Sequence, residues 1–154
     1  MSYTPTRLLL LAIAKQLNDS NTGTFSLTVP YADTDTGIIL KTMPDKPDRC
    51  ITLNWVPAST DGSMPHTTGI LQAACRGKPD NPLDSDDLAD QCDQTLDGIT
   101  QLDCGDGVTV NLCNHRNRVN MGQDDLKRWT TATQYTVELD TPGTTLKPTT
   151  GAWQ

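Results

Sequence analysis

One run of twelve residues, WTTATQYTVELD at 129–140, constrains the fold of this chain more than any other stretch. Its residues alternate with a period of two, which is the period of side chains on a β-strand. The run therefore predicts a long strand, and a strand of this length needs neighbouring strands to pair with. One side of the predicted strand carries Trp129, Thr131, Thr133, Tyr135, Val137 and Leu139.

Two other segments, 50–56 and 69–76, alternate in the same way and predict two further strands. In the second of them, Gln72 and Arg76 fall on the side opposite the apolar residues. That polar side is free to face solvent or another molecule. The side expected to be buried carries Ile51, Leu53, Trp55, Leu71, Ala73 and Cys75.

Two segments have the spacing of amphipathic helices. Residues 5–18 repeat apolar side chains every three or four positions, with Thr4 placed to cap the helix and Pro5 suited to its first position. Residues 84–97 do the same, with Asp84 expected as the cap and Gly98 suited to the position after the helix.

The remaining segments are irregular. Residues 23–40 are β-rich but interrupted, 43–48 form a link with two prolines, and 57–68 predict a long polar loop. A CGDG turn at 104–107 separates two β-prone runs and predicts a hairpin. Residues 141–154 are rich in Pro, Gly and Thr and predict a tail outside the folded domain.

This order of elements predicts one α+β domain over residues 1–140, with two helices packed on one face of a mostly antiparallel sheet. Hydrophobic residues make up 35% of the chain, which is low for a domain of 154 residues and predicts a thin core. A thin core is better stabilised when the chain also buries surface against other subunits.

Charge and hydropathy exclude two classes of partner. The formal net charge is −7, with 12 basic and 19 acidic residues scattered along the chain. A protein that binds nucleic acid without sequence preference needs clustered Lys and Arg, which this chain lacks. The apolar run at 8–14 is too short to cross a bilayer and has no cleavage site of a signal peptide, so we expect no membrane partner.

The sequence shows no catalytic or metal-binding pattern, and we expect neither an enzyme nor a bound cofactor. The five cysteines are odd in number and widely spaced, which favours reduced thiols in a cytoplasmic setting. Cys75 lies on the apolar side of its strand and is expected to be a core thiol. Cys104, Cys113 and His115 lack the spacing of a zinc site, and the acidic run at 84–87 lacks the spacing of a calcium loop.

Aromatic and charged residues mark candidate contacts between subunits. Trp55 and Trp129 suit either the core or an interface, and Trp153, in the polar tail, is a candidate for docking on a neighbour. The GQDDLKR turn at 122–128 is either solvated or provides Asp125 and Arg128 to an ion pair across a subunit contact.

Several of these segments, in this order, resemble the tail-terminator proteins of long-tailed bacteriophages, often called minor capsid proteins. MPDKPDRCITL is similar to the family's proline-rich link into a strand, and LQAACRG to its strand with Gln72, Arg76 and Gly77. MGQDDLKRWTTATQYTV is similar to the closing motif of the family. Its matching residues are Gly122, Asp125, Arg128, Tyr135 and Val137. The chain departs from the family pattern at Ala74, where a basic residue is common, and in the tail after residue 141.

The resemblance implies a structural virion protein of the siphovirus type, assembled in the cytoplasm of the host bacterium. Such proteins form a ring, commonly a hexamer, on the head-proximal end of the tail tube, where they stop tube polymerisation and meet the head-completion proteins. DNA passes through the lumen without specific binding. The implied interface candidates are Gln72, Arg76, Asp125, Arg128, Trp55, Trp129 and Trp153, with Arg76 and Arg128 facing Asp125 of a neighbour.

Three alternatives remain open from the residues. The chain is also compatible with another small head–tail connector or a tail-tube subunit. A cysteine hydrolase would need Cys75 or Cys104 to be unusually reactive. An unrelated binding module would stay monomeric and ignore tail-tube protein.

Overall fold

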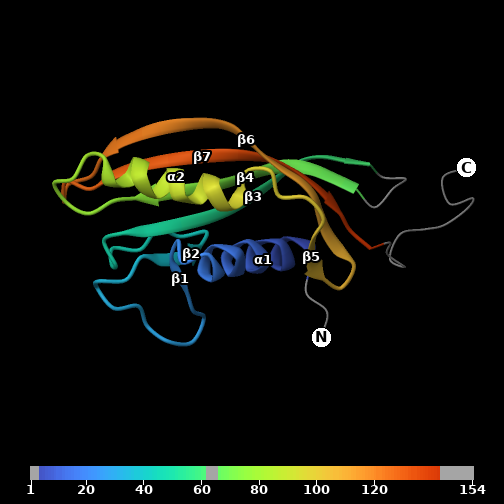
Figure 1. The fold of residues 1–154 in the computed structure, drawn as a ribbon, viewed down its shortest axis with the longest axis horizontal. Helices are drawn as coiled ribbons and strands as arrows, with labels where there is room; N and C mark the ends of the chain where they lie inside the picture. Colours follow the sequence, from blue (N-terminus) through green and yellow to red (C-terminus); the bar gives the residue numbers. More distant parts are fainter. Residues whose placement is uncertain (1–3, 62–65, 143–154) are drawn as a thin grey trace, which may run out of the picture.

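The computed structural model describes residues 4–61 and 66–142 (Figure 1). Within them the chain forms two helices, α1 (Pro5–Asp19) and α2 (Asp84–Leu96). It also forms seven strands: β1 (Thr24–Phe25), β2 (Gly37–Leu40), β3 (Cys50–Asp61), β4 (His66–Arg76), β5 (Leu102–Gly105), β6 (Val108–Gln123) and β7 (Trp129–Asp140).

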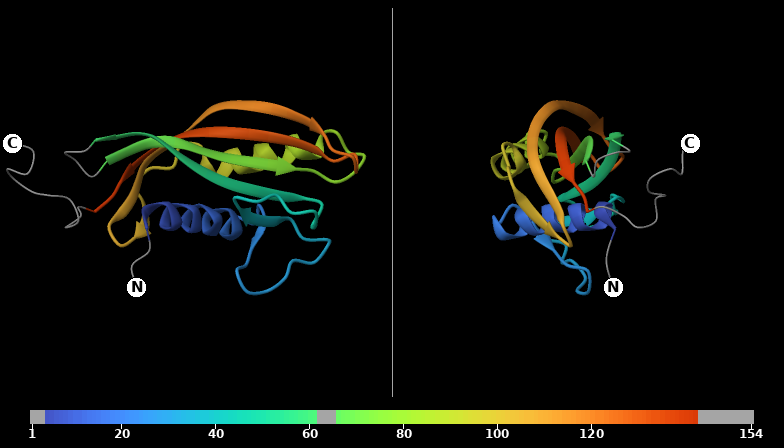
Figure 2. Two further views of the ribbon diagram at one scale, coloured as in Figure 1. Left: turned by 180° about the vertical axis from the view of Figure 1, so that it is seen from behind. Right: turned by 90° about the vertical axis from the view of Figure 1, so that its right-hand side faces the viewer.

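The strands make one mixed sheet in the order β1-β2-β3-β4-β7-β6-β5. The pairs β3–β4, β4–β7, β7–β6 and β6–β5 are antiparallel, whereas β1, β2 and β3 run parallel to one another. The prediction of a mostly antiparallel sheet therefore misses this edge, where the 41–49 link carries the chain back so that β3 runs alongside β2. The sheet is strongly curled, as the end-on view shows (Figure 2).

The core lies in the hollow of this curl. The predicted alternation is confirmed, because the inward residues of β3, β4 and β7 pack against the buried side chains of both helices. The largest fully buried side chains come from α1, α2 and five strands, so no single element supplies the core. They include Leu9, Ile13, Leu17, Ile38, Ile51, Leu53, Leu71, Leu88, Leu96, Val108, Tyr135 and Leu139.

The predicted polar loop at 57–68 is wrong at 57–61 and 66–68, which are strand, and its residues 62–65 lie outside the described residues. β3 continues to Asp61 and β4 begins at His66, and the two strands stay paired to their ends. His66 also pairs with Asp140 of β7, so this ribbon extends the sheet beyond the core. Pro57 is tolerated because the register shifts between Pro57 and Ser59, where a bulge leaves a backbone position unpaired.

The helix boundaries agree with the sequence except at one cap. Thr4 is the N-cap residue of α1, and Gly98 follows α2 with a φ of +89°, which glycine adopts at no steric cost. The cap of α2 is Leu83, not Asp84. Asp84 is instead the first helical residue, and its carboxylate accepts hydrogen bonds from Arg49 Nε at 3.1 Å and from the Lys78 backbone N–H at 2.8 Å.

Gly77 allows β4 and α2 to meet closely. A Cβ atom at this position would lie 2.7 Å from the backbone nitrogen of Ser85 and 2.9 Å from Asp84 Cβ. Both are rigid parts of the helix start, so the turn after β4 needs a residue without a side chain. In the described part of the chain, no helix is both long and apolar enough to span a membrane.

Candidate interaction site

The cysteines form no reactive centre in the described residues. Cys75 is fully buried beneath α2, as predicted, and its sulfur lies 3.7 Å from that of Cys92. The Cys92 thiol and burial together raise the pKa of Cys75 well above its ordinary value. Burial also raises the pKa of Cys104 to about 11 and that of Cys113 to about 12. Thiols that stay protonated are poor nucleophiles, so these side chains act as core residues.

A half-buried polar cluster joins α2 to β6 and β7. The carboxylate of Asp93 accepts hydrogen bonds from the Tyr135 hydroxyl, from His115 Nδ1 at 2.9 Å and from Arg118 Nη2 at 3.1 Å. Arg118 also donates to Asp90 at 2.7 Å. These bonds fix α2 over the sheet. In the part of the chain that the structure describes, no group of three or more His, Cys, Asp and Glu side chains has the geometry of a metal site.

Two buried arginines hold the link before β3. Arg76 donates from Nε to the Asp48 carbonyl at 2.7 Å and from Nη2 to the carbonyls of Pro47 at 2.8 Å and Asp45 at 3.3 Å. Arg128 donates to the same Asp45 carbonyl at 2.6 Å. Each arginine is only 4% exposed.

Carboxylates balance the charge of Arg128. Arg128 contacts Asp48 Oδ1 at 3.0 Å and Asp124 Oδ2 at 2.8 Å. Asp125, the expected partner of these arginines on a neighbouring copy, is exposed in the β6–β7 turn. That intersubunit pairing stays a prediction. The partners of Arg76 and Arg128 within the chain are a finding that the sequence pattern does not reveal.

The tryptophans separate by environment. Trp55 is 7% exposed and belongs to the core cluster, while Trp129 is partly exposed at the start of β7. Trp153 lies outside the described residues. Among the three, Trp129 is thus the one that the structure places at the boundary between core and surface.

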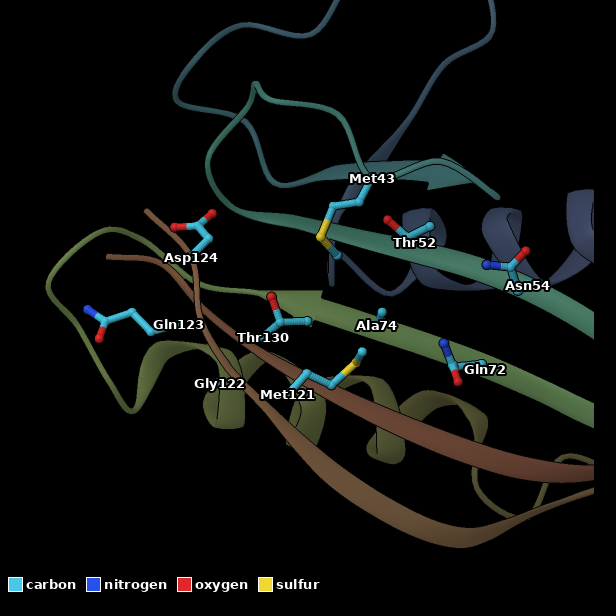
Figure 3. A pocket seen from close by; sticks show the side chains of 10 residues that line it. All are labelled: Met43, Thr52, Asn54, Gln72, Ala74, Met121, Gly122, Gln123, Asp124 and Thr130. Atoms are coloured by element: carbon cyan, nitrogen blue, oxygen red, sulfur yellow. The ribbon is translucent and has the colours of Figure 1, made fainter. Parts of the chain in front are cut away.

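The outer surface of the sheet carries a groove near its β6–β7 turn (Figure 3). Its cavity is about 330 Å³. Ala74 of β4 lines the groove, and its small side chain leaves space above the sheet. Gln72 lies at one end, on the side of the sheet predicted from the alternation, and its carbonyl accepts a hydrogen bond from Gln134 at 3.4 Å.

Two methionines flank this groove and were not among the candidates from sequence. Met43 comes from the link that the arginines hold, and Met121 comes from β6, where it is 61% exposed (Figure 3). Met121 lies two residues after Val119, which is the spacing of side chains on one face of a strand, and both are exposed. The structure shows that Val119 and Met121 belong to the long strand β6, which the sequence pattern left unassigned beyond residue 113.

Comparison with known proteins assigns the chain to a family. The model of the bacteriophage tail terminator proteins matches residues 14–141, which is most of the chain and all of the sheet. This chain belongs to the bacteriophage tail terminator family. Tail terminators are structural proteins of the phage tail, and the buried, protonated thiols described above agree with a structural role.

A solved structure shares the fold of this chain. The chain is similar to a protein of the virion of a native gene transfer agent particle, with a TM-score of 0.67 and 13% sequence identity. The similarity covers 90% of this chain and 99% of that protein. At this identity the likeness concerns the fold. None of the curated proteins matches the sequence.

Proposed function

We propose that this protein forms a ring at the head-proximal end of the phage tail tube, where it stops tube polymerisation and joins the tail to the head-completion proteins. The observation that carries the proposal is the family match over residues 14–141. We further propose that residues 1–140 act as the ring-forming domain, that the ring is a hexamer, and that it assembles in the cytoplasm of the host.

The outer edge of β6 supports a role in assembly. β5 pairs with β6 only over Val108–Val110, and Ile99 bridges Cys113. Beyond Cys113, no strand among the described residues pairs with that edge, although β6 runs on to Gln123. Unpaired strand edges of this length are normally covered, and a neighbouring subunit in a ring would cover this one.

The charge of the chain supports passage of DNA without binding. Asp87 and Asp90 of α2 and Asp97, which follows the helix, are exposed, and the net charge is −7. If this helix lines the lumen, it repels the phosphate backbone and lets DNA slide.

The test is the length of tail tubes assembled in the presence of this protein. Purified tail-tube subunits are polymerised with and without it, and tube lengths are measured by electron microscopy. The proposal predicts short tubes that carry one added ring at an end and no longer grow. Unchanged tube lengths would contradict the terminator role, and tubes made by this protein without added tube subunits would identify a tube subunit instead.

A further inference from the structure

The groove on the outer face of the sheet has the chemistry of a site for one aromatic side chain. Met43 and Met121 lie on opposite walls, and Ala74 lies between them on the floor (Figure 3). Methionine sulfur makes favourable contacts with aromatic rings and adapts to their shape. A cavity of about 330 Å³ is at the small end of the range for ligand sites, so it suits a side chain better than a large ligand.

Polar groups around the groove select among aromatic residues. The hydroxyl of Thr52 lines the groove and is buried without a hydrogen-bond partner among the described residues. If the hydroxyl donates its proton to the thiol of Cys50, two residues away on β3, the Thr52 oxygen still has lone pairs that can accept a hydrogen bond. The side-chain amides of Asn54 and Gln72 supply further acceptors. An indole ring, whose N–H only donates, matches these acceptors.

The chain itself contains one indole outside the described residues, Trp153. Tyr3 is the other aromatic residue there, and it is bonded directly to Thr4 at the start of α1, which packs on the core side of the sheet. Residues 62–65 contain no aromatic residue. Trp153 is therefore the occupant that this chain can provide.

The reach of the C-terminal segment favours a neighbouring copy over the same chain. β7 starts beside the groove and ends at Asp140, about 33 Å away at 3.3 Å per residue. From Asp140 to Trp153 the chain spans at most about 43–47 Å when fully extended. After a reversal of direction it would have to be about three quarters extended to reach its own groove, well beyond the roughly 18–22 Å typical of a flexible segment of this length. The C-terminal segment of a neighbouring copy placed head to tail can enter the groove without being so extended.

We propose that Trp153 of one copy docks between Met43 and Met121 of the next copy and fastens neighbouring subunits together. This inference rests on the proposed ring, because it needs a second copy placed head to tail. The segment after residue 141, which has no counterpart in the motifs shared with the family, thereby gains a function. Ala74 keeps the floor open, where a long basic side chain would fill it.

Cross-linking between copies tests the docking. One copy carries Gln123→Cys at the groove, and the other carries Gln154→Cys beside Trp153, so the methionines and the indole stay in place. A short bismaleimide reagent joins the two thiols. We expect a dimeric product from the mixture, reduced at least tenfold when Trp153→Ala is added to the second copy.

Matched controls separate docking from chance collision. Leu83→Cys replaces Gln123→Cys in one mixture, because Leu83 is exposed at the start of α2 and is not among the residues that line the groove. Wild-type protein, which lacks the added cysteines, measures how far the reagent reacts with the native thiols. Cross-linking no greater than with Leu83→Cys overturns the inference. A double variant, Gln123→Cys/Gln154→Cys, tests docking within one chain. If it forms a cross-link within single chains while the mixture of single variants gives no dimer, the inference is also overturned.

Light scattering on the same variants separates this inference from the proposed function. If light scattering shows rings but the specific cross-link is absent, the docking of Trp153 is contradicted and the proposed ring is supported. The specific cross-link without rings supports the docking and contradicts the ring.

Discussion

Replacing Arg76 by methionine tests how the link before β3 is held. The guanidinium is 4% exposed and donates three hydrogen bonds to the carbonyls of Asp45, Pro47 and Asp48. Methionine retains most of the side-chain volume, so the change removes the charge and the donors with little loss of packing. It also removes this donor from the carbonyls of Pro47 and Asp48, whereas the Asp45 carbonyl keeps its hydrogen bond from Arg128. The nearby carboxylates of the link lose one positive charge.

The expected loss of stability is about 3–5 kcal/mol. A hydrogen bond from a charged donor contributes roughly 1.5–3 kcal/mol, and three such bonds do not add fully because they share one rigid group. Leaving a buried acceptor without its donor costs about 1–3 kcal/mol, so the carbonyls of Pro47 and Asp48 alone give a loss that includes this range. This is a large share of the stability of a single domain, which is about 5–15 kcal/mol.

Urea denaturation followed by tryptophan fluorescence measures this loss. With a slope of about 2 kcal/mol per molar urea, the midpoint falls by roughly 1.5–2.5 M. Arg116→Met is the matched control, because Arg116 is exposed on β6 and exposed substitutions usually change stability by about 0.5 kcal/mol or less. A midpoint for Arg76→Met within about 0.3 M of that control would refute the proposed role of the guanidinium.

Three further predictions follow from the same packing. Gly77→Ala is expected to destabilise the fold by more than about 1 kcal/mol in the same assay, because its Cβ would lie 2.7 Å from the Ser85 nitrogen. Iodoacetamide is expected to leave Cys75 unlabelled in native protein at pH 8, since its pKa is raised, and rapid labelling detected by mass spectrometry would contradict a core thiol. Burial pushes the pKa of Asp124 up, but hydrogen bonds from Arg128 outweigh it and hold the pKa below its ordinary value. The stability that this pair provides is therefore present above about pH 4 and lost as pH falls below it, so the urea midpoint of Arg128→Met should fall less steeply from pH 5 to pH 2.5 than that of the wild type.

Local periodicity was sufficient to predict the central strands and both helices. The alternation at 129–140 and 69–76 identifies the residues that β7 and β4 bury, because the pleat of a strand forces neighbouring side chains to opposite faces. It failed at 57–61, where Pro57 and several small polar residues look like a loop. The strand continues there because β4 pairs with both β3 and β7, and these backbone partners are invisible to local sequence.

The groups that shape the candidate site depend on contacts between distant residues. Arg76 and Arg128 could be selected from motifs, but their shared acceptor, Asp45, lies 31 and 83 residues away along the chain. Met43 and Met121 come together for the same reason. β4 and β7 lie between β3 and β6 in the sheet, so the link before β3 and the end of β6 meet only across the folded sheet, which no local sequence pattern predicts.

The most direct test of the ring is the mass of the purified protein in solution. Multi-angle light scattering across a concentration series, with and without tail-tube protein, measures it without labels. The account predicts a discrete closed oligomer, six copies of the 16.8 kDa chain, that forms either in isolation or when tube ends are present. A protein that stays monomeric at every concentration and leaves tail-tube protein unchanged would contradict it.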